Sequence, residues 1–407
     1  MTAGARPVRG LPVTTTGEDV TALLAALRAA LRGDGPAPAP HPSDRGPAPA
    51  AGAGHPLGDG EDEDSDPTAA VVATSGSTGE PKAALLPASA LLASAAATHD
   101  RLGGPGTWLL AVPPHTVAGV LVAVRCLTAG TEPGVCDLRG GFSPDRFAVA
   151  AGALRGHRRY TALVAAQVRR VLDAGGPALA ALAALDAVLL GGGPVPGGMR
   201  EDARRAGVRL VATYGSSETS GGCVYDGRPL DGVVVDTTPD GRVRVAGPVV
   251  ARGYRARPGH PAFDDSPWGR RFTTDDLGAL TDGVVTVEGR VDDVVVSGGY
   301  KVSVHLVADV LRARPGVRDA AVVGVPDREW GTRLAAAVVA APGTRLDPVR
   351  LRRDVAAELG RWAAPDVVVV DELPTTGPGK TDRGAVRRLV TARMRPRPPA
   401  PGPEGAR

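Results

Sequence analysis

The stretch at residues 74–82 reads TSGSTGEPK and directly follows the apolar run AAVVA at residues 69–73. The apolar run predicts a strand, and the small residues after it predict a loop whose backbone N–H groups can turn toward an anion. Hydroxyl side chains add donors to this loop, and Lys82 adds a positive charge. The combination suits a polyphosphate, although the GxxxxGK[ST] spacing of a Walker A loop is absent. Taken alone, the stretch could also be a flexible loop of serine and glycine.

Lysine is rare in this chain of 407 residues. It occurs only as Lys82, Lys301 and Lys380. Ile and Asn are absent, so nearly all of the 47 basic residues are Arg. A retained lysine is informative because Arg cannot replace an ammonium that must act as a compact point charge. Lys380 lies in PTTGPGKTDR at residues 374–383, where Pro374 occupies the position of the first Walker A glycine. We therefore expect a lysine presented on a Gly/Pro loop, with an ordinary exposed lysine as the alternative.

Charge and composition exclude several classes of protein. The net charge is only +3 and the basic residues are spread, so a nucleic-acid-binding stripe is not expected. The most apolar stretch, 109–130, is interrupted by Pro113, His115 and Arg125, which argues against a membrane span. No export segment, CxxC pair or zinc-binding histidine spacing occurs. These features predict a soluble, cytoplasmic protein.

The first 67 residues divide into two segments of different composition. Residues 18–32 carry Leu and Ala at helical spacing, so we expect residues 1–32 to form a short N-terminal helical segment. Residues 33–67 are rich in Pro, Ala and Gly and include the acidic run 61–66. This composition predicts a disordered linker.

The rest of the chain predicts an α/β fold in two domains. From residue 68 apolar strands alternate with helical patterns, which favours parallel sheets with crossover helices. Residues 233–290 change to short alternating strands with turns, which predicts an antiparallel β subdomain within a large domain at 68–291. Residues 292–393 read as a small, mobile α+β domain, and 394–407 as a disordered tail.

Three further clusters follow predicted strands or turns. Residues 191–193 are glycines at a strand end, where ligands approach parallel sheets, but Pro196 breaks the GxGxxG fingerprint. Tyr214 and Glu218 place a ring and a carboxylate after another strand. The acidic pairs 275–276 and 292–293 flank Arg290. Taken alone, the three glycines could equally form a plain tight turn, and Tyr214 could be an ordinary core residue. Glu218 and the acidic pairs could be solvated charges.

Together the motifs TSGSTGEPK, YGSSET, FTTDDLG, GRVDD and PTTGPGKTDR resemble, in order and spacing, those of the acyl-adenylate-forming enzymes. This superfamily includes acyl- and aryl-CoA synthetases and nonribosomal adenylation domains, and the resemblance covers residues 69–390. Within it, PPHTVAG at 113–119 and GGCVYDGRPLDG at 221–232 are similar to the o-succinylbenzoate:CoA ligases of menaquinone biosynthesis in their short actinobacterial form.

The resemblance implies an AMP-forming acid:thiol ligase that uses ATP, Mg²⁺ and CoA with a small carboxylic acid. It assigns catalysis to Lys380, Glu218 and Thr78, with Glu218 positioning the metal. The implied hinge and CoA-side loop are Asp292, Gly298 and Gly299, and the implied acyl pocket contains His115, Gln167 and Gly221. The implied ATP-binding residues are Thr74, Ser75, Gly76, Ser77, Thr78, Gly79, Lys82, Gly192, Gly193, Pro194, Tyr214, Gly215, Ser216, Ser217, Asp276 and Arg290.

The chain departs from the family pattern at two places. Thr116 stands where the family usually has His, and Val304, Leu306 and Ala308 replace a usual Pro and two Glu. Gln167 could equally be an exposed helical residue. Two other functions stay open: a ligase or adenylation enzyme for a different acid, and a non-catalytic nucleotide-binding paralogue. The sequence leaves the oligomeric state open.

Overall fold

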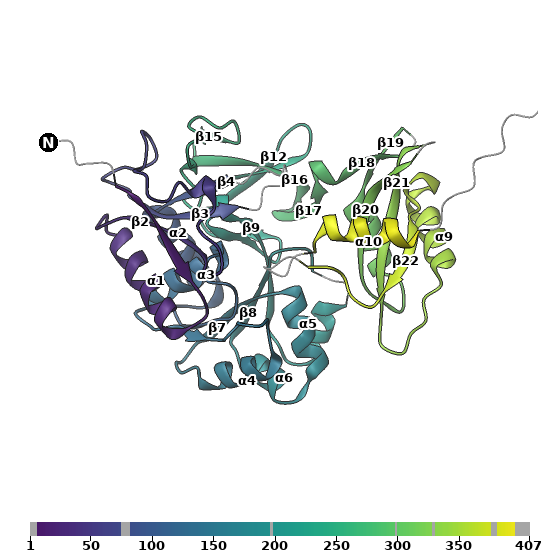
Figure 1. The fold of residues 1–407 in the computed structure, drawn as a ribbon, viewed down its shortest axis with the longest axis horizontal. Coiled ribbons are helices and arrows are strands. Elements are labelled where there is room, and N and C mark those ends of the chain that lie inside the picture. Colours follow the sequence, from purple (N-terminus) through teal and green to yellow (C-terminus); the bar gives the residue numbers. More distant parts are fainter. Residues whose placement is uncertain are drawn as a thin grey trace, which may run out of the picture. The chain divides into compact units, whose positions relative to one another are not determined.

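The computed structural model divides the chain into two compact units, one ending at Val291 and the other beginning at Asp292 (Figure 1). It describes residues 6–74, 82–195, 198–297, 299–327, 330–375 and 381–394, without the side chains of Asp292 and Lys301. Within these ranges, no helix is both long and apolar enough to cross a membrane.

A seven-stranded sheet forms the centre of the described part of the large unit, in the order β11-β10-β9-β8-β7-β5-β6. Its parallel strands are β5 (Thr107–Leu110), β6 (Gly134–Val135), β7 (Arg159–Val164), β8 (Ala187–Gly191) and β9 (Leu210–Ser216). The antiparallel strands β10 (Gly221–Tyr225) and β11 (Arg228–Pro229) complete it. The expected strand and helix alternation is confirmed for this sheet.

Helices cover both faces of this sheet because successive strand residues point to opposite sides. Trp108, Leu110 and Leu189 pack in one apolar cluster with α2 (Ala88–Leu102) and α3 (Val117–Ala129). Leu109 and Leu190 pack in a second cluster on the other face. The helices of that cluster are α4 (Pro144–Ala153), α5 (Ala165–Ala174), α6 (Gly176–Ala183) and α7 (Met199–Arg205).

Two antiparallel sheets accompany it. One contains β3 (Thr68–Thr74), β4 (Lys82–Pro87) and β14 (Gly253–Tyr254), so the strand before the glycine-rich loop is not part of the parallel sheet. The other contains β12 (Val234–Thr237), β13 (Arg242–Ala246), β15 (Phe263–Ser266), β16 (Gly269–Thr281) and β17 (Val284–Arg290). Asp282 and Gly283, both at positive φ, form the turn between β16 and β17. Two successive positive φ values are typical of tight hairpins.

The prediction of a disordered linker at 33–67 was wrong. Strand β1 (Val8–Val13) pairs in parallel with β2 (Ala37–Pro42), and α1 (Gly17–Ala30) connects them. Every second residue of β2 is a proline, yet the alternate residues Ala37 and Ala39 are fully buried. Proline removes only its own N–H group, so alternate residues can still pair with one neighbouring strand.

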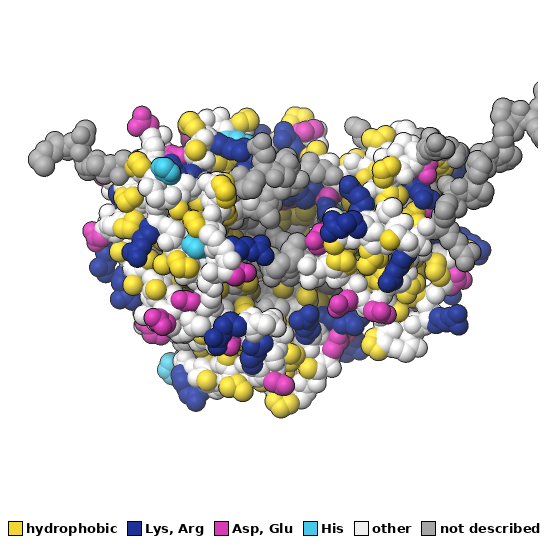
Figure 2. Space-filling model, viewed as in Figure 1, with side chains coloured by type: hydrophobic (Ala, Val, Ile, Leu, Met, Phe, Trp, Pro, Cys, Tyr) yellow, Lys and Arg dark blue, Asp and Glu magenta, His cyan; other side chains and the backbone are white. Residues whose placement is uncertain are grey.

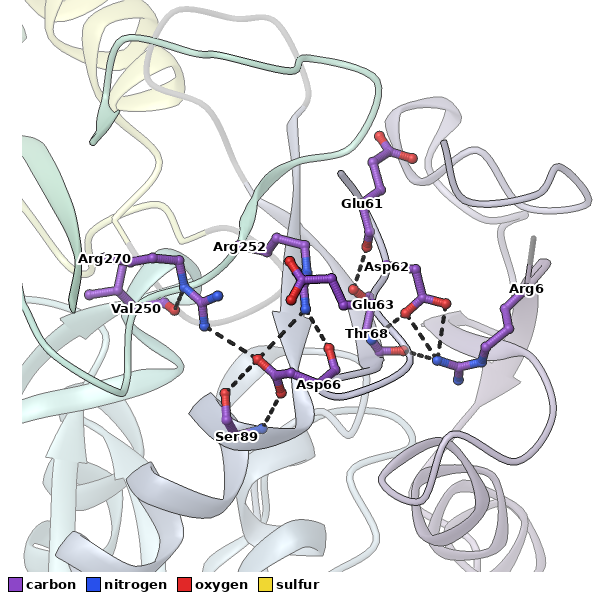
Figure 3. A network of polar contacts seen from close by, with 10 residues as sticks. All are labelled: Arg6, Glu61, Asp62, Glu63, Asp66, Thr68, Ser89, Val250, Arg252 and Arg270. Atoms are coloured by element: carbon purple, nitrogen blue, oxygen red, sulfur yellow. Dashed lines mark hydrogen bonds and ion pairs between the residues drawn. The ribbon is translucent and has the colours of Figure 1, made fainter. Parts of the chain in front are cut away.

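The acidic run is held by basic residues from distant parts of the chain (Figure 3). Asp66 accepts hydrogen bonds from the Ser89 N–H and hydroxyl at 2.9 and 2.8 Å, and forms ion pairs with Arg252 and Arg270. Arg6 pairs with Asp62 at 3.1 Å. These contacts replace the water that the acidic side chains would otherwise need, so the segment folds onto the large unit.

A second ion pair of the run is buried. Glu61 pairs with Arg255, and it also accepts hydrogen bonds from the N–H groups of Gly58 and Ala256. Its side chain is 7% exposed and that of Arg255 is 9% exposed.

On the face of the large unit drawn in Figure 2, positive and negative side chains are interspersed, so no basic stripe gathers on that face.

The small unit packs helices on both faces of a three-stranded sheet within its described residues. Strand β21 (Gly331–Ala340) pairs with β20 (Val317–Asp327) in antiparallel and with β22 (Asp366–Val370) in parallel fashion. Helices α8 (Val304–Arg312) and α9 (Pro348–Leu359) share one apolar cluster, and α10 (Arg383–Arg393) contributes to the other. A hairpin of β18 (Val294–Ser297) and β19 (Tyr300–Ser303) leads into α8.

Candidate nucleotide and acyl site

The two ends of the predicted phosphate loop face each other across a hairpin. Thr74, the last residue of β3, lies opposite Lys82, the first residue of β4. The connecting residues 75–81 lie outside the described part, and with them the predicted Ser75, Gly76, Ser77, Thr78 and Gly79. The described strands therefore fix where the loop starts and ends.

Glu218 lies just beyond the end of β9, in a short 3-10 turn at Ser217–Thr219. Its side chain is 8% exposed, and its Oε1 atom accepts a hydrogen bond of 2.7 Å from the Tyr254 hydroxyl. The Thr219 hydroxyl accepts from the Ser216 N–H at 2.8 Å, which ties the turn together. Burial, together with the Glu218 carboxylate, raises the pKa of Tyr254, so this hydroxyl stays protonated and donates.

This arrangement fits a magnesium ion shared with a polyphosphate. Mg²⁺ is usually held by one or two carboxylates together with substrate phosphates, and not by a cage of protein ligands alone. Among the described residues, no group of three or more His, Cys, Asp or Glu side chains could hold a metal. Glu218 supplies one buried carboxylate, of which Oε1 is anchored by Tyr254.

Asp276, Arg290 and Tyr214 form a second polar cluster. Asp276 on β16 pairs in register with Arg290 on β17, and its Oδ1 accepts from Arg290 Nη1 at 2.9 Å. Its Oδ2 accepts from the Tyr214 hydroxyl at 2.8 Å. Each carboxylate oxygen retains a further lone pair, so both can still accept ribose hydroxyls. Burial, with Asp276 nearby, raises the pKa of Tyr214.

The predicted adenine-binding residues leave neighbouring strands at the same edge of the parallel sheet. Leu190 of β8 lies opposite Ala212 of β9, so continuing that register places Gly192 level with Tyr214. Gly192 has a φ of +87°, and Gly193 and Pro194 are exposed. This edge, at the carboxyl ends of parallel strands, is where ligands bind in such folds.

A close backbone approach explains the glycine at 215. A Cβ atom on Gly215 would lie 2.0 Å from the Gly221 carbonyl oxygen, so no larger residue fits there. The contact lies where β9 turns into β10. It holds Ser216, Ser217 and Glu218 at the end of the sheet.

His115, Thr116 and Gly221 lie around the start of α3 and β10. His115 is half-buried, and burial lowers its pKa. The Thr116 hydroxyl accepts from the Gly119 N–H at 3.3 Å and donates to the Pro113 carbonyl at 2.8 Å. Thr116 therefore caps α3, which gives the departure from the usual His a structural reason. Gly221 is buried at a φ of +82°, and its Cβ position is 3.5 Å from Leu121 of α3.

Gln167 is 8% exposed, so the alternative of an exposed helical glutamine was wrong. Its Oε1 accepts from the Val164 N–H at 2.9 Å and its Nε2 donates to the Ala111 carbonyl at 2.8 Å. The amide thus ties the start of α5 to the end of β5. Each bond uses one of the two hydrogen-bonding positions on its atom, so one N–H and one lone pair of the Gln167 amide are left for an acid.

The remaining predicted residues are Asp292, Gly298, Gly299 and Lys380. Lys380, Gly298 and the side chain of Asp292 lie outside the described part, while Gly299 is exposed at a φ of +86°. The family departures follow from helix packing: Val304 and Ala308 of α8 are buried, and Leu306 is half exposed. An apolar face thus replaces the usual acidic positions.

Sequence reasoning missed Tyr254 and the ionic cluster around Asp293. The Asp293 carboxylate is 4% exposed, pairs with Arg383 and lies 3.1 Å from His305 Nε2. These residues come from three separate segments of the small unit. Asp293 and Arg383 each ended a quoted motif, GRVDD and PTTGPGKTDR, but the motifs gave no sign that the two residues pair.

The chain was compared with protein families and with known proteins by sequence. The family model described as AMP-binding enzyme matches residues 22–255, and that of the AMP-binding enzyme C-terminal domain matches 306–380. A probable 2-succinylbenzoate–CoA ligase of Mycobacterium tuberculosis is 48% identical over 328 residues, covering 79% of this chain and 85% of that protein. A feruloyl-CoA synthase of Amycolatopsis is 30% identical over 358 residues, covering 77% and 68%.

Among solved structures, E. coli MenE with bound OSB-AMS has the same fold. It aligns with a TM-score of 0.75 at 24% identity, and the alignment covers 97% of this chain and 89% of that one. On the strength of the family models and of the Mycobacterium relative, the chain belongs to the AMP-binding enzyme family.

Proposed function

We propose that this protein is an ATP-dependent acid:CoA ligase that activates 2-succinylbenzoate as an acyl-AMP and transfers the acyl group to CoA, a step of menaquinone biosynthesis. The observation that carries the proposal is the 48% identity to the probable 2-succinylbenzoate–CoA ligase of Mycobacterium tuberculosis over 79% of this chain. Two polar clusters, Glu218 with Tyr254 and Asp276 with Tyr214, support the nucleotide half of the chemistry.

In the first half-reaction the substrate carboxylate attacks the α-phosphate of ATP and displaces pyrophosphate. Thr74, Lys82 and the loop between them bind the β- and γ-phosphates, and Lys380 contacts the attacking carboxylate and the α-phosphate. Glu218, with help from Thr78, would hold Mg²⁺, which would supply positive charge that screens the phosphates.

The nucleoside is oriented by residues of the sheet edge. Asp276 accepts the ribose hydroxyls while Arg290 holds its Oδ1 atom. Tyr214 and residues 192–194 enclose the adenine. With the base and ribose fixed, the α-phosphate is presented to the acid in one orientation, which lowers the entropic part of the barrier.

In the second half-reaction the CoA thiolate attacks the acyl carbonyl and releases AMP. We assign the change between the two steps to rotation about Asp292, which replaces Lys380 by the loop at Gly298 and Gly299. One site serves two reactions if a small domain exchanges the catalytic groups that it presents.

We also place this activity in the cytoplasm. Cys126, Cys136 and Cys223 are buried as free thiols, and burial raises the pKa of each. Unpaired thiols are typical of reducing compartments. CoA, the second substrate of the proposed reaction, also carries a free thiol.

The test is to measure pyrophosphate release and CoA-thioester formation with Mg-ATP, CoA and a panel of acids. We expect thioester formation selective for 2-succinylbenzoate over benzoates, ferulate and fatty acids. The similarity to a feruloyl-CoA synthase makes an aryl acid the second candidate substrate. Activity with ferulate alone would replace the proposed substrate, and ATP binding without pyrophosphate release would favour a non-catalytic paralogue.

A further inference from the structure

Tyr254 contacts both charged groups that frame the phosphate side of the site. Its hydroxyl donates to Glu218 Oε1 at 2.7 Å. The ammonium nitrogen of Lys82 lies over its ring, 5.1 Å from the centroid. A cation at this distance over an aromatic face is attracted by the ring quadrupole. One buried side chain, 5% exposed, therefore lies against an anion at its hydroxyl and a cation at its face.

The main chain fixes Tyr254 between these two partners. Tyr254 pairs with Ala84 in the β14–β4 ladder, two residues beyond Lys82. On the other side, the Ala251 N–H donates to the Glu218 carbonyl at 2.8 Å. The segment 251–254 is thus hydrogen-bonded to the strand that carries the lysine and to the turn that carries the glutamate.

Two rings hold the orientation of the Tyr254 ring. His260 meets it nearly edge-on, with centroids 4.8 Å apart and planes at 82°, and Phe263 does so at 5.1 Å and 81°. Edge-to-face contacts of this kind favour one ring orientation. The Tyr254 hydroxyl therefore stays directed at Glu218 while the ring face stays available to Lys82.

Opposite charges that contact the same side chain would gain energy by pairing directly, and such a pair would occupy both groups before ATP arrives. Among the described residues, Lys82 and Glu218 form no ion pair with each other, and each contacts Tyr254 in its place. We infer that Tyr254 is a positioning residue that keeps the Glu218 carboxylate and the Lys82 ammonium apart and oriented for Mg-ATP. This inference rests on the ATP-binding part of the proposed function.

The test compares Mg-ATP binding by the full-length wild type, Tyr254→Phe and Tyr254→Met, measured by calorimetry without acid or CoA. Tyr254→Phe keeps the ring and loses the hydrogen bond to a carboxylate, so we expect Mg-ATP affinity to fall about tenfold. The half-saturating Mg²⁺ concentration should rise by a similar factor. Tyr254→Met also removes the ring from Lys82 while filling the space flexibly, so its loss should be larger.

Tyr160→Phe is the matched control. Tyr160 is also buried and its hydroxyl donates to the Gly104 carbonyl at 3.1 Å, but it lies in the sheet core and contacts neither Lys82 nor Glu218. Its loss of one hydrogen bond should lower thermal stability as much as Tyr254→Phe without changing Mg²⁺ dependence. Equal Mg-ATP affinities of Tyr254→Phe and Tyr160→Phe would overturn the inference.

A double-mutant cycle adds a readout that a purely structural role would not move. If Tyr254 acts through Glu218, Tyr254→Phe should change Mg²⁺ dependence little in a Glu218→Gln background, whereas additive losses would overturn the inference. A wild type that binds Mg-ATP but activates none of the acids contradicts the proposed function alone. A wild type that binds no Mg-ATP overturns both.

Discussion

The carboxylate of Asp276 is oriented by two neighbouring side chains. The FTTDDLG motif predicted this carboxylate for the ribose, and the structure adds that its two oxygens are held by Arg290 and Tyr214. The sequence placed each residue in a motif, but it could not give the contacts, because Tyr214 lies 62 residues from Asp276. For Gln167 the structure shows a structural role instead. Its side-chain amide hydrogen-bonds to the main chain at Val164 and Ala111, and nothing in the sequence around it indicated these contacts.

Lys380→Ala should separate the two half-reactions. Loss of one charge-stabilising donor is expected to raise the adenylation barrier by about 3 kcal/mol. Thioester formation from supplied acyl-AMP should stay nearly unchanged, because that step uses a different loop. Single-turnover assays of each half-reaction measure this, with Arg388→Ala on the exposed side of α10 as the control. Equal losses in both half-reactions would contradict the two-state account.

His99 should make the large unit sensitive to acid. Its Nε2 accepts from the Trp108 indole N–H at 3.3 Å, and burial, aided by Arg125 and opposed by Asp100, lowers the pKa of His99 to about 4. Below its usual pKa of about 6.5 the unfolded chain takes up a proton that the folded protein refuses, so stability falls as pH falls from there toward about 4.

The matched pair for this prediction is His99→Gln and His157→Gln, because His157 is exposed. From about pH 7 to about pH 5, the wild type should lose about 2 kcal/mol more unfolding free energy than His99→Gln. His157→Gln should follow the wild type. Urea unfolding at both pH values checks this, and parallel losses in all three proteins would exclude a neutral buried His99.

At the scale of elements, the sheet with its covering helices was predictable and the segment after α1 was not. Buried strands such as β8 are indicated in the sequence by apolar runs, and helices such as α3 by the periodicity of their apolar residues. Residues 33–67 lack such a pattern, and the acidic side chains of Glu63, Glu61 and Asp66 pair with Arg252, Arg255 and Arg270, which lie 189, 194 and 204 residues away in sequence. Composition alone cannot reveal a partner at that separation.

The Glu61–Arg255 pair should be required for this docking. Glu61→Gln leaves the buried Arg255 guanidinium without its counter-charge, which is expected to lower the free energy of unfolding by about 3 kcal/mol. Asp64→Asn, an exposed change in the same acidic run, should have little effect. Thermal unfolding of both variants measures the difference. A Glu61→Gln protein as stable as Asp64→Asn would show that the pair contributes nothing.

At the scale of the whole molecule, the chain consists of two compact units that meet in sequence at Val291 and Asp292. The change of strand and helix pattern along the chain predicted a large part at 68–291 and a small part at 292–393. Which side chains surround the junction could not be predicted. Asp293 and its partners Arg383 and His305 come from residues that no single motif contains.

Asp292→Pro should test the proposed rotation. Proline fixes its own φ and restricts the residue before it, so it should hinder passage between two arrangements of the units. We expect the complete reaction to slow at least about tenfold while one half-reaction alone is largely retained. Asp292→Ala removes the side chain but leaves the backbone free, and should keep both. Separate assays of the half-reactions decide the matter, and unchanged turnover by Asp292→Pro would exclude rotation at this residue.

The alternating prolines of β2 have one more effect. The Ala37 N–H donates to the Pro7 carbonyl, so the alternate positions Pro38, Pro40 and Pro42 turn their nitrogens to the other side of the strand. That side offers carbonyl groups but no donors from these three positions, and another chain would find too few partners to pair with it. The composition that concealed this strand thus also removes the N–H donors through which a further strand could pair on that side.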